Sequence, residues 1–227
     1  IVHTFILVMI LSMNIDIVGP TFLEGDCLTS RFLEHCHQKS YNPKQLIINE
    51  GDPSNDLYYI IEGSVTVMMG DNEGNEIVLA YLNAGEFFGE IGLFNDKLNR
   101  SAFVKAKTKS QIAKISYEKV KSLNNIFPEL VFSIASQMAI RLRKTSRKVS
   151  DLAFTDVKGR VARTLLDLCK EPDAVTHPDG MQIHITRHEL GRIVSCSREM
   201  VGRVLKSLEE DHLISVSGKT MVIFGTR

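Results

Sequence analysis

The feature that most constrains the fold of this chain is a change in the spacing of its apolar residues near Pro128. After that proline, apolar positions recur at alternating gaps of four and three residues, which is an a/d heptad pattern. The positions are Val131, Ala135, Met138, Leu142, Thr145, Val149 and Leu152. The pattern predicts a long helix over residues 127–154 that pairs with a second copy of itself rather than lying flat on one sheet. A helix that only docks on its own domain remains the alternative.

The preceding segment has the pattern of short strands. Between about Leu46 and Ile115, short apolar runs are separated by Gly, Asn and Asp, and DNEGN at 71–75 has the composition of a hairpin turn. Many short strands with closely spaced turns are typical of an antiparallel barrel or jelly roll. We therefore expect an N-terminal antiparallel β jelly roll over residues 22–126.

A second domain is predicted over residues 155–227. Its first helical segment, VKGRVARTLLDLCKE, ends before Pro172. Thr186 then begins a short helix as a cap, with Glu189 three residues later as in a capping box. The break SCS leads into a second helix, SREMVGRVLKSLEED, and two strands around Gly218-Lys219 follow. This order predicts a winged helix-turn-helix, and an α+β fold for the whole chain.

The second helix of this motif has two chemically different faces when its residues are placed about 100° apart. One face is apolar and consists of Val201, Val204, Leu205 and Leu208. The other carries Arg198, Glu199, Gly202, Arg203 and Lys206. Arginine can bind guanine O6 and N7 with two hydrogen bonds, and glutamate can accept one from cytosine N4, so this face suits a DNA major groove. An ordinary amphipathic surface helix is the alternative.

Charge is distributed unevenly along the 227 residues. The net charge is zero, but residues 1–137 carry 11 Lys/Arg against 16 Asp/Glu, whereas 138–227 carry 16 against 11. The two halves therefore have net charges of −5 and +5, which indicates an acidic module joined to a nucleic-acid-binding one. With 44% hydrophobic and 24% charged residues, the composition is that of an ordinary globular protein.

Several classes of protein are disfavoured by what the sequence contains. The cysteines are Cys27, Cys36, Cys169 and Cys196, which lie far apart and predict free thiols in a reducing cytoplasm, with no metal site. The apolar start IVHTFILVMILSM is too short to span a bilayer and lacks a basic n-region, so we expect residues 1–21 to be an extension without function and predict no membrane association. No nucleophile–base pair emerges, so an enzyme is not expected.

The stretch GEFFGEIGLFNDKLNRSAFV at 85–104 combines a glycine turn, a carboxylate and an arginine. Glu90 and Arg100, flanked by Gly89 and Gly92, are the parts of a site for a small, polar anion. Burying an unpaired anion costs several kcal/mol, and backbone N–H groups together with a guanidinium can meet that charge. The two side chains would also compensate each other. A buried Arg–Glu pair that only ties strands together is the alternative.

These motifs carry a resemblance to a known family. EGDPSNDLYYIIEGSVTV, FGEIGLF and NRSA are similar to the cyclic-nucleotide-binding domain. With the long helix and the winged helix, residues 22–227 resemble the cyclic AMP receptor and fumarate-nitrate regulator family of bacterial transcription regulators. The resemblance implies a homodimeric, cAMP-dependent regulator, mainly an activator, that binds double-stranded DNA and contacts RNA polymerase.

The resemblance also implies a set of ligand-binding residues. Glu90 would hold the ribose 2′-OH, Arg100 the phosphate, and Arg141 would support the site. Thr145 and Ser146 would read the adenine edge, with the serine coming from the partner subunit. The full implied set for cAMP is Gly89, Glu90, Ile91, Gly92, Arg100, Ser101, Ala102, Arg141, Thr145 and Ser146.

For DNA and RNA polymerase the resemblance implies three further groups of residues. Arg198, Glu199 and Arg203 would read a TGTGA-like half-site of an inverted repeat. The phosphate contacts would come from Arg187, Ser197 and Lys206. The polymerase contacts would come from Thr176, His177 and Gly180 in an exposed loop and from the basic patch of His37, Lys39 and Lys119. Plain solvated surface is the alternative for both polymerase groups.

Four positions depart from the family pattern. Met200 stands where a phosphate-contacting Thr is usual, His188 where Gln is usual, Ile140 where Arg is usual, and Lys39 where His is usual. Weaker contacts to the DNA backbone are expected from the first two. Two other functions stay open at this point: a regulator of the same fold with another cyclic nucleotide or no effector, and a nucleotide-binding subunit that controls a kinase or channel.

Overall fold

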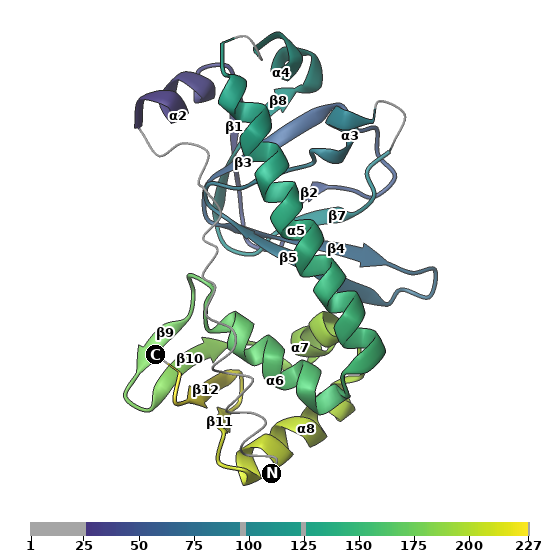
Figure 1. Cartoon of the computed structure of the whole chain (residues 1–227), viewed down its shortest axis with the longest axis vertical. Coiled ribbons are helices and arrows are strands. Elements are labelled where there is room, and N and C mark those ends of the chain that lie inside the picture. Colours follow the sequence, from purple (N-terminus) through teal and green to yellow (C-terminus); the bar gives the residue numbers. More distant parts are fainter. Residues whose placement is uncertain (1–25, 96–98, 124–125, 227) are drawn as a thin grey trace.

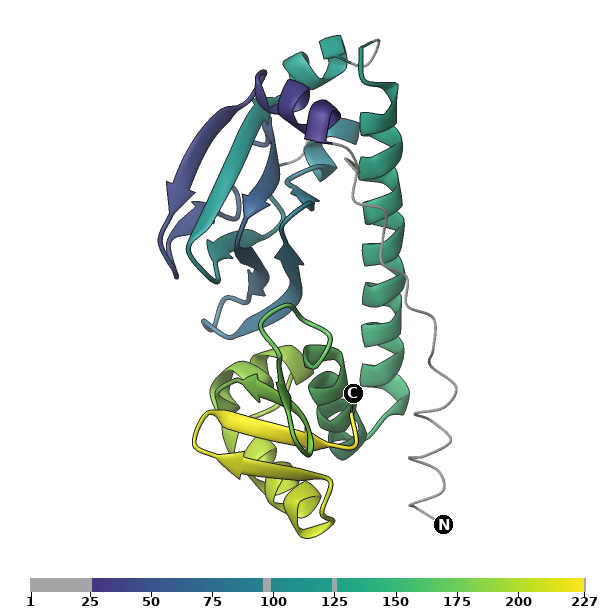
Figure 2. The same cartoon turned by 90° about the vertical axis from the view of Figure 1, so that its left-hand side faces the viewer.

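The computed structural model describes residues 26–95, 99–123 and 126–226. The long helix α5 (Pro128–Phe154) connects a β-sandwich to a smaller domain made of helices and a sheet (Figure 1). Figure 2 shows both domains on the same side of this helix. The mixed helix and sheet fold predicted from the sequence is confirmed, and the extension predicted for residues 1–21 lies outside the described residues.

The N-terminal domain contains two four-stranded antiparallel sheets in the described chain. The first has the strand order β1 (His37–Tyr41), β8 (Ser110–Ser116), β3 (Asp56–Glu62) and β6 (Phe87–Phe88). The second has the order β2 (Leu46–Ile48), β7 (Phe103–Ala106), β4 (Ser64–Gly70) and β5 (Glu76–Asn83). The predicted turn at 71–75 joins β4 to β5, where the carboxylate of Asp71 accepts hydrogen bonds from the backbone of Glu73 and Asn75.

Strand β3 is apolar along its whole length because both of its faces are buried. Tyr58 and Ile60 point between the two sheets, whereas Leu57 and Tyr59 belong to a second core on the outer face of the first sheet. This division follows from the two-residue period of a strand, whose side chains alternate between faces. The sequence run LYYII therefore marks a strand that is covered on both sides.

Helices cover that outer face. They are α2 (Asp26–Leu33), α4 (Tyr117–Leu123) and the first turns of α5, which contribute Phe32, Leu123, Leu130 and Ile134 to the second core. Helix α5 therefore does lie against its own domain, which corrects the expectation that it would not. It does so mainly through Leu130, Ile134 and Gln137, with the heptad residue Met138 at the margin of the same core.

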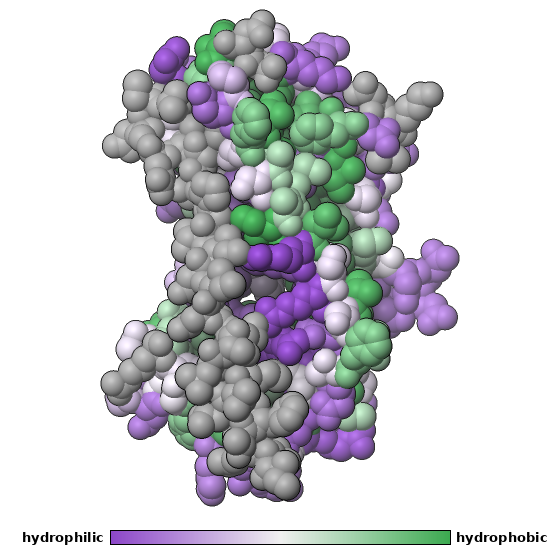
Figure 3. Space-filling model, viewed as in Figure 1, coloured by the Kyte–Doolittle hydropathy of each residue, from purple (hydrophilic) through white to green (hydrophobic). Residues whose placement is uncertain are grey.

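The heptad positions of α5 stay largely exposed in the single chain. Leu142, Val149 and Leu152 are 69%, 61% and 46% exposed, and Phe132 beside them is 79% exposed. Figure 3 shows apolar side chains along this face of the helix. One basic residue that flanks this face is buried: Lys148 donates from Nζ to the carbonyls of Val78 and Leu79 in β5, and burial lowers its pKa.

The C-terminal domain has a winged helix-turn-helix arrangement. Its helices are α6 (Val157–Leu168), α7 (Arg187–Val194) and α8 (Arg198–Glu210). Its sheet has the order β11 (Ile214–Ser217), β12 (Thr220–Phe224), β10 (Gly180–His184) and β9 (Val175–His177). The four apolar positions predicted for α8 are all buried in this domain's core, so the predicted orientation of the helix is confirmed.

Side-chain caps and one backbone turn fix the helix-turn-helix. The hydroxyl of Thr186 accepts from the Glu189 N–H at 3.1 Å, and the hydroxyl of Ser197 accepts from the Met200 N–H at 3.2 Å. Between the helices Ser195 has a left-handed backbone, with φ +56°. The capping box expected at Glu189 is only half formed, because its carboxylate instead accepts from the hydroxyl of Tyr81 in the other domain.

Candidate functional site

The anion site begins at a glycine turn that leads into the short helix α3 (Ile91–Phe94). Gly89 has φ +73°, and a Cβ at this position would lie 2.7 Å from Nη1 of Arg100. A Cβ on Gly92 would lie 2.8 Å from Cβ of Ser54. Side chains at either position would therefore force the arginine or the facing loop away, which explains the two glycines in GEIG.

Arg100 is held inside this turn and is only 8% exposed. Its Nη1 donates to the Gly89 carbonyl at 2.9 Å and to the Tyr117 hydroxyl at 3.1 Å, and its Nη2 donates to the Asp56 carbonyl at 2.7 Å. The guanidinium also lies over the Tyr58 ring, with Cζ 5.5 Å from the centroid. These three acceptors fix the direction of the guanidinium. Because they are neutral, they leave its positive charge uncompensated inside the turn.

This arrangement fits a bound anion. A guanidinium has five N–H donors, and the three bonds above leave two of them available. Among the described residues, no carboxylate lies within ion-pair distance of Arg100. A buried cation without a charged partner is costly, and a phosphate would compensate it. The expected mutual pairing of Arg100 with Glu90 is not observed.

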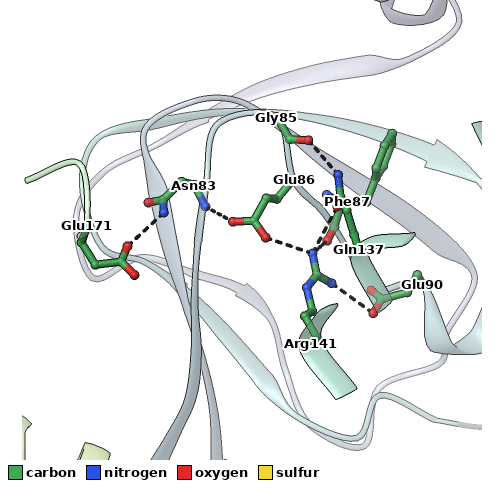
Figure 4. Close-up of polar contacts among 8 residues, drawn as sticks. All are labelled: Asn83, Gly85, Glu86, Phe87, Glu90, Gln137, Arg141 and Glu171. Carbon is green, nitrogen blue, oxygen red and sulfur yellow. Dashed lines mark hydrogen bonds and ion pairs between the residues drawn. The ribbon is translucent and has the colours of Figure 1, made fainter. Parts of the chain in front are cut away.

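Glu90 pairs with a different arginine. It is also 8% exposed, and its Oε1 lies 3.1 Å from Nη1 of Arg141, which comes from α5 (Figure 4). Nη2 of Arg141 lies 3.6 Å from Glu86 and donates to the Phe87 carbonyl. Glu90 therefore receives its charge partner from the long helix, so the carboxylate that is expected to bind a ribose is tied to α5.

A glutamine of α5 braces the same turn. Gln137 is buried, accepts from the Phe87 N–H at 2.8 Å and donates to the Gly85 carbonyl at 3.1 Å. The buried Nε of Arg141 has no hydrogen-bond partner among the described residues. We name Glu86, Glu90, Gln137 and Arg141 the hinge cluster, since these residues fasten the turn to the helix. Sequence reasoning missed Glu86 and Gln137, because only their position in space shows that they belong to the site.

The other residues predicted to bind the nucleotide lie around this centre with different exposure. Ser101 is exposed and Ala102 half-buried beside Arg100, and Ile91 is 47% exposed at the start of α3. Thr145 and Ser146 lie one turn beyond Arg141 on α5 and are exposed in the single chain. Thr145 is one of the exposed heptad positions, and Ser146 follows it on the helix.

The side chains predicted to contact DNA lie on one exposed surface. Arg187, Arg198, Glu199 and Lys206 line an open groove of about 650 Å³ together with Gly202, Leu205, Glu209 and Val216. Arg203 is exposed on the same helix, and Ser197 caps its N-terminus. The structure thus brings the six predicted DNA-contacting residues to α8 and the facing end of α7, with the wing strand β11 forming the far wall.

Comparison with known proteins identifies both domains. Residues 38–125 match the family model of the cyclic nucleotide-binding domain, and residues 159–224 match that of the Crp-like helix-turn-helix domain. The chain is 59% identical over 200 residues to Vfr of Pseudomonas aeruginosa, described as a cAMP-activated global transcriptional regulator, with 87% of this chain and 94% of Vfr covered. The chain belongs to the CRP family of transcription regulators.

Two further relatives agree with this placement. The CRP protein of Salmonella typhimurium, also described as cAMP-activated, is 55% identical over 196 residues, with 86% of this chain and 93% of that protein covered. Among solved structures, the regulator CLP of Xanthomonas campestris is 42% identical, has a TM-score of 0.83 and covers 89% of this chain and 100% of its own. CLP is described as c-di-GMP responsive. The predicted family and its fold, a cyclic nucleotide-binding jelly roll with a winged helix-turn-helix, are confirmed.

The residues predicted to face RNA polymerase differ in exposure. His37 and Lys39 on β1 and Lys119 on α4 are exposed. His37 lies opposite Lys114 in the register of β1 with β8, and β8 ends where α4 begins. Thr176 is exposed on β9 and His177 is partly so. Gly180 is buried, and a Cβ there would lie 2.0 Å from the Ile223 carbonyl oxygen. The expectation of an exposed stretch is therefore wrong at Gly180, whose lack of a side chain is explained by strand packing.

Two kinds of feature are absent from the part of the chain that the structure describes. It contains no group of three or more His, Cys, Asp or Glu side chains that could hold a metal ion. It also contains no helix with the length and apolar character needed to cross a bilayer.

Proposed function

We propose that this chain is a cAMP-activated regulator that binds, as a homodimer, to inverted repeats with TGTGA-like half-sites and contacts RNA polymerase there. The observation that carries the proposal is the pair of buried charges, Arg100 and Glu90, that line a glycine turn without pairing with each other. Curated relatives of 55–59% identity are described as cAMP-activated, which favours this nucleotide.

The chemistry of the ligand matches these side chains. A cyclic phosphodiester has one negative charge, and the two remaining donors of Arg100 can meet it with charge-assisted hydrogen bonds. Glu90 accepts hydrogen bonds only, so it suits the ribose 2′-OH. Because ordered carbonyls hold the arginine in place before the ligand arrives, binding costs little reorganisation. We expect binding of the nucleotide without hydrolysis.

The exposed heptad face of α5 supports the dimer. Leu142, Val149 and Leu152 expose apolar surface to water in the single chain. A second copy that covered them would stabilise the dimer, since burial of apolar area contributes about 25 cal/mol per Å² of free energy. A polar residue such as Thr145 in a heptad seam lowers stability, so it usually has a specific role. We assign to Thr145 and the partner's Ser146 the recognition of the adenine edge.

A two-fold dimer places one α8 helix in each of two successive major grooves. Arg198, Glu199 and Arg203 then read bases, while Arg187, Ser197 and Lys206 hold phosphates. Half-sites about one helical turn apart follow from this symmetry. The surfaces around Thr176 and His177 and around His37, Lys39 and Lys119 are exposed or partly exposed in the single chain, and we assign them to RNA polymerase.

The experiment that tests this function measures binding to a TGTGA inverted repeat by fluorescence anisotropy, with and without cAMP, and the mass of the free protein by sedimentation. We expect a dimer whose affinity for the repeat rises with cAMP and for which a scrambled repeat is a weak ligand. A monomer, or equal affinity with and without the nucleotide, would contradict the proposal.

A second effector is favoured by one observation. CLP, 42% identical and similar along its entire length, is described as c-di-GMP responsive. Calorimetry with cAMP, cyclic GMP and c-di-GMP distinguishes the two functions, since each function predicts a heat of binding for its own nucleotide at micromolar concentration. A heat of binding for c-di-GMP alone would identify c-di-GMP as the effector in place of cAMP. The DNA-binding part of the proposal would be unaffected.

A further inference from the structure

The hinge cluster continues into the DNA-binding domain through two more residues (Figure 4). Oε2 of Glu86 accepts from the backbone N–H of Asn83 at 2.8 Å. The side-chain amide of Asn83, at the end of β5, donates from Nδ2 to Oε2 of Glu171 at 3.0 Å. Glu171 follows helix α6, so a continuous series of polar contacts joins Glu90 to the C-terminal domain.

Other contacts between the domains lie outside this series. Lys107 and Asp173 form an ion pair of 2.9 Å, and the hydroxyl of Tyr81 donates to Glu189 at 2.8 Å. Burial and the adjacent Glu189 carboxylate both raise the pKa of Tyr81, so this phenol stays protonated and keeps donating. Among the described residues, none of these four side chains forms a hydrogen bond with the hinge cluster. The Lys107–Asp173 and Tyr81–Glu189 contacts hold the two domains together, but they are not connected to Glu90 through the hinge cluster.

Arg141 is the branch point of the series. Its guanidinium is shared between two carboxylates, Glu90 at 3.1 Å and Glu86 at 3.6 Å. A ligand group that binds to Glu90 weakens the attraction between the Glu90 carboxylate and Arg141. Glu86 is then the other carboxylate within reach of Arg141. A cation shared between two carboxylates can occupy two arrangements, which is the kind of element that couples distant sites.

We propose that Glu171 senses occupation of the nucleotide site through Asn83, Glu86 and Arg141. The inference rests on the proposed function of Glu90. When Glu90 accepts the ribose hydroxyl, Arg141 moves toward Glu86, Glu86 loosens its hold on the end of β5, and the Asn83–Glu171 contact opens. The DNA-binding domain is then free to take the orientation that α8 needs on DNA.

The test uses Glu171→Ala in the full chain, because alanine removes the acceptor of the Asn83 amide. Asp173→Ala is the matched control that removes the neighbouring interdomain ion pair with Lys107. The quantity measured is the ratio of operator Kd without cAMP to that with saturating cAMP. Glu171→Ala should raise affinity without cAMP and lower this ratio about 2- to 30-fold, as mutations along coupling networks do. Thermal melting of both variants checks that each is folded.

A double-mutant cycle separates a relay from simple docking. In a Glu86→Gln background, Glu171→Ala should have no further effect on the ratio, whereas Asp173→Ala should have the same effect as in the unaltered chain. Additive effects of Glu86→Gln and Glu171→Ala would overturn the relay. If the unaltered chain showed no response to cAMP, the proposed function would fail; a full response that Glu171→Ala leaves unchanged would overturn the relay alone.

Discussion

The proposed nucleotide site and the helix proposed to read DNA use the same two side-chain types in opposite environments. Arg100 and Glu90 are each 8% exposed, and backbone carbonyls or a second arginine hold them in one orientation. Arg198 and Glu199 are exposed on the wall of an open groove. Buried charges must be compensated in place, so they are costly to change, whereas exposed charges are hydrated and contribute to binding only when a partner arrives.

This comparison predicts the largest effect at Arg100. Arg100→Leu should weaken cAMP binding at least ~30-fold, since truncating one partner of a buried, hydrogen-bonded charge pair costs about 2 kcal/mol or more. The Asp56 carbonyl loses its Arg100 donor in the same change, whereas the Gly89 carbonyl still accepts from the Tyr117 hydroxyl. The loss at Asp56 should lower the free energy of unfolding by about 1–3 kcal/mol. Calorimetry and urea denaturation measure the two effects.

The control for that variant is Lys109→Leu, an exposed lysine of the same domain. It should change neither nucleotide affinity nor the free energy of unfolding beyond ~0.5 kcal/mol. Equal affinities for Arg100→Leu and Lys109→Leu would show that the buried guanidinium is not the anion-binding group.

The exposed counterpart is Arg198. Arg198→Ala should raise the operator Kd about 5- to 150-fold and relax specificity at one base pair, as expected for loss of a bidentate base contact of 1–3 kcal/mol. Its free energy of unfolding should stay within ~0.5 kcal/mol of the original, because no buried group loses a partner. A large loss of stability would mean that the comparison between the two environments is wrong.

Gly92 tests how tightly the buried site is packed. Gly92→Ala should lower the free energy of unfolding by about 1–3 kcal/mol, because its Cβ would lie 2.8 Å from Cβ of Ser54 and 2.9 Å from the Tyr117 hydroxyl. Thermal or urea unfolding measures the loss. Unchanged stability would indicate that the loop around Ser54 adapts freely.

Gly202 is the matched glycine on the exposed helix. Its nearest neighbour for an added Cβ is Cδ of Arg187 at 3.9 Å, an ordinary contact distance. Gly202→Ala should therefore raise the free energy of unfolding by about 0.5–1 kcal/mol, the difference in helix propensity between the two residues. If Gly92→Ala and Gly202→Ala lowered the free energy of unfolding by similar amounts, the surroundings of Gly92 would be no more tightly packed than those of Gly202.

Much of this architecture follows from local patterns in the sequence. The short apolar runs of β3 and β5, the turn at 71–75 and the apolar face of α8 are local features of the chain, so they could be predicted without tertiary information. The glycines of GEIG were equally informative, because each stands where a side chain would collide with a neighbour.

The partners of the charged residues could not be predicted in the same way. Glu90 and Arg100 are ten residues apart and were expected to pair, yet Glu90 pairs with Arg141, 51 positions away. Glu189 was expected to complete its own cap, yet its carboxylate accepts from Tyr81 in the other domain. Such choices depend on which long side chains the packed domains bring within reach, and no local spacing carries that information.

The central claim is that an anion held by Arg100 controls how well α8 binds DNA. The most direct measurement is operator Kd for the unaltered chain and for Arg100→Leu, each with and without saturating cAMP. The account predicts an affinity that rises about tenfold or more with cAMP in the unaltered chain, within the range of allosteric coupling, and no change in Arg100→Leu. An equal response of both proteins to the nucleotide would contradict it.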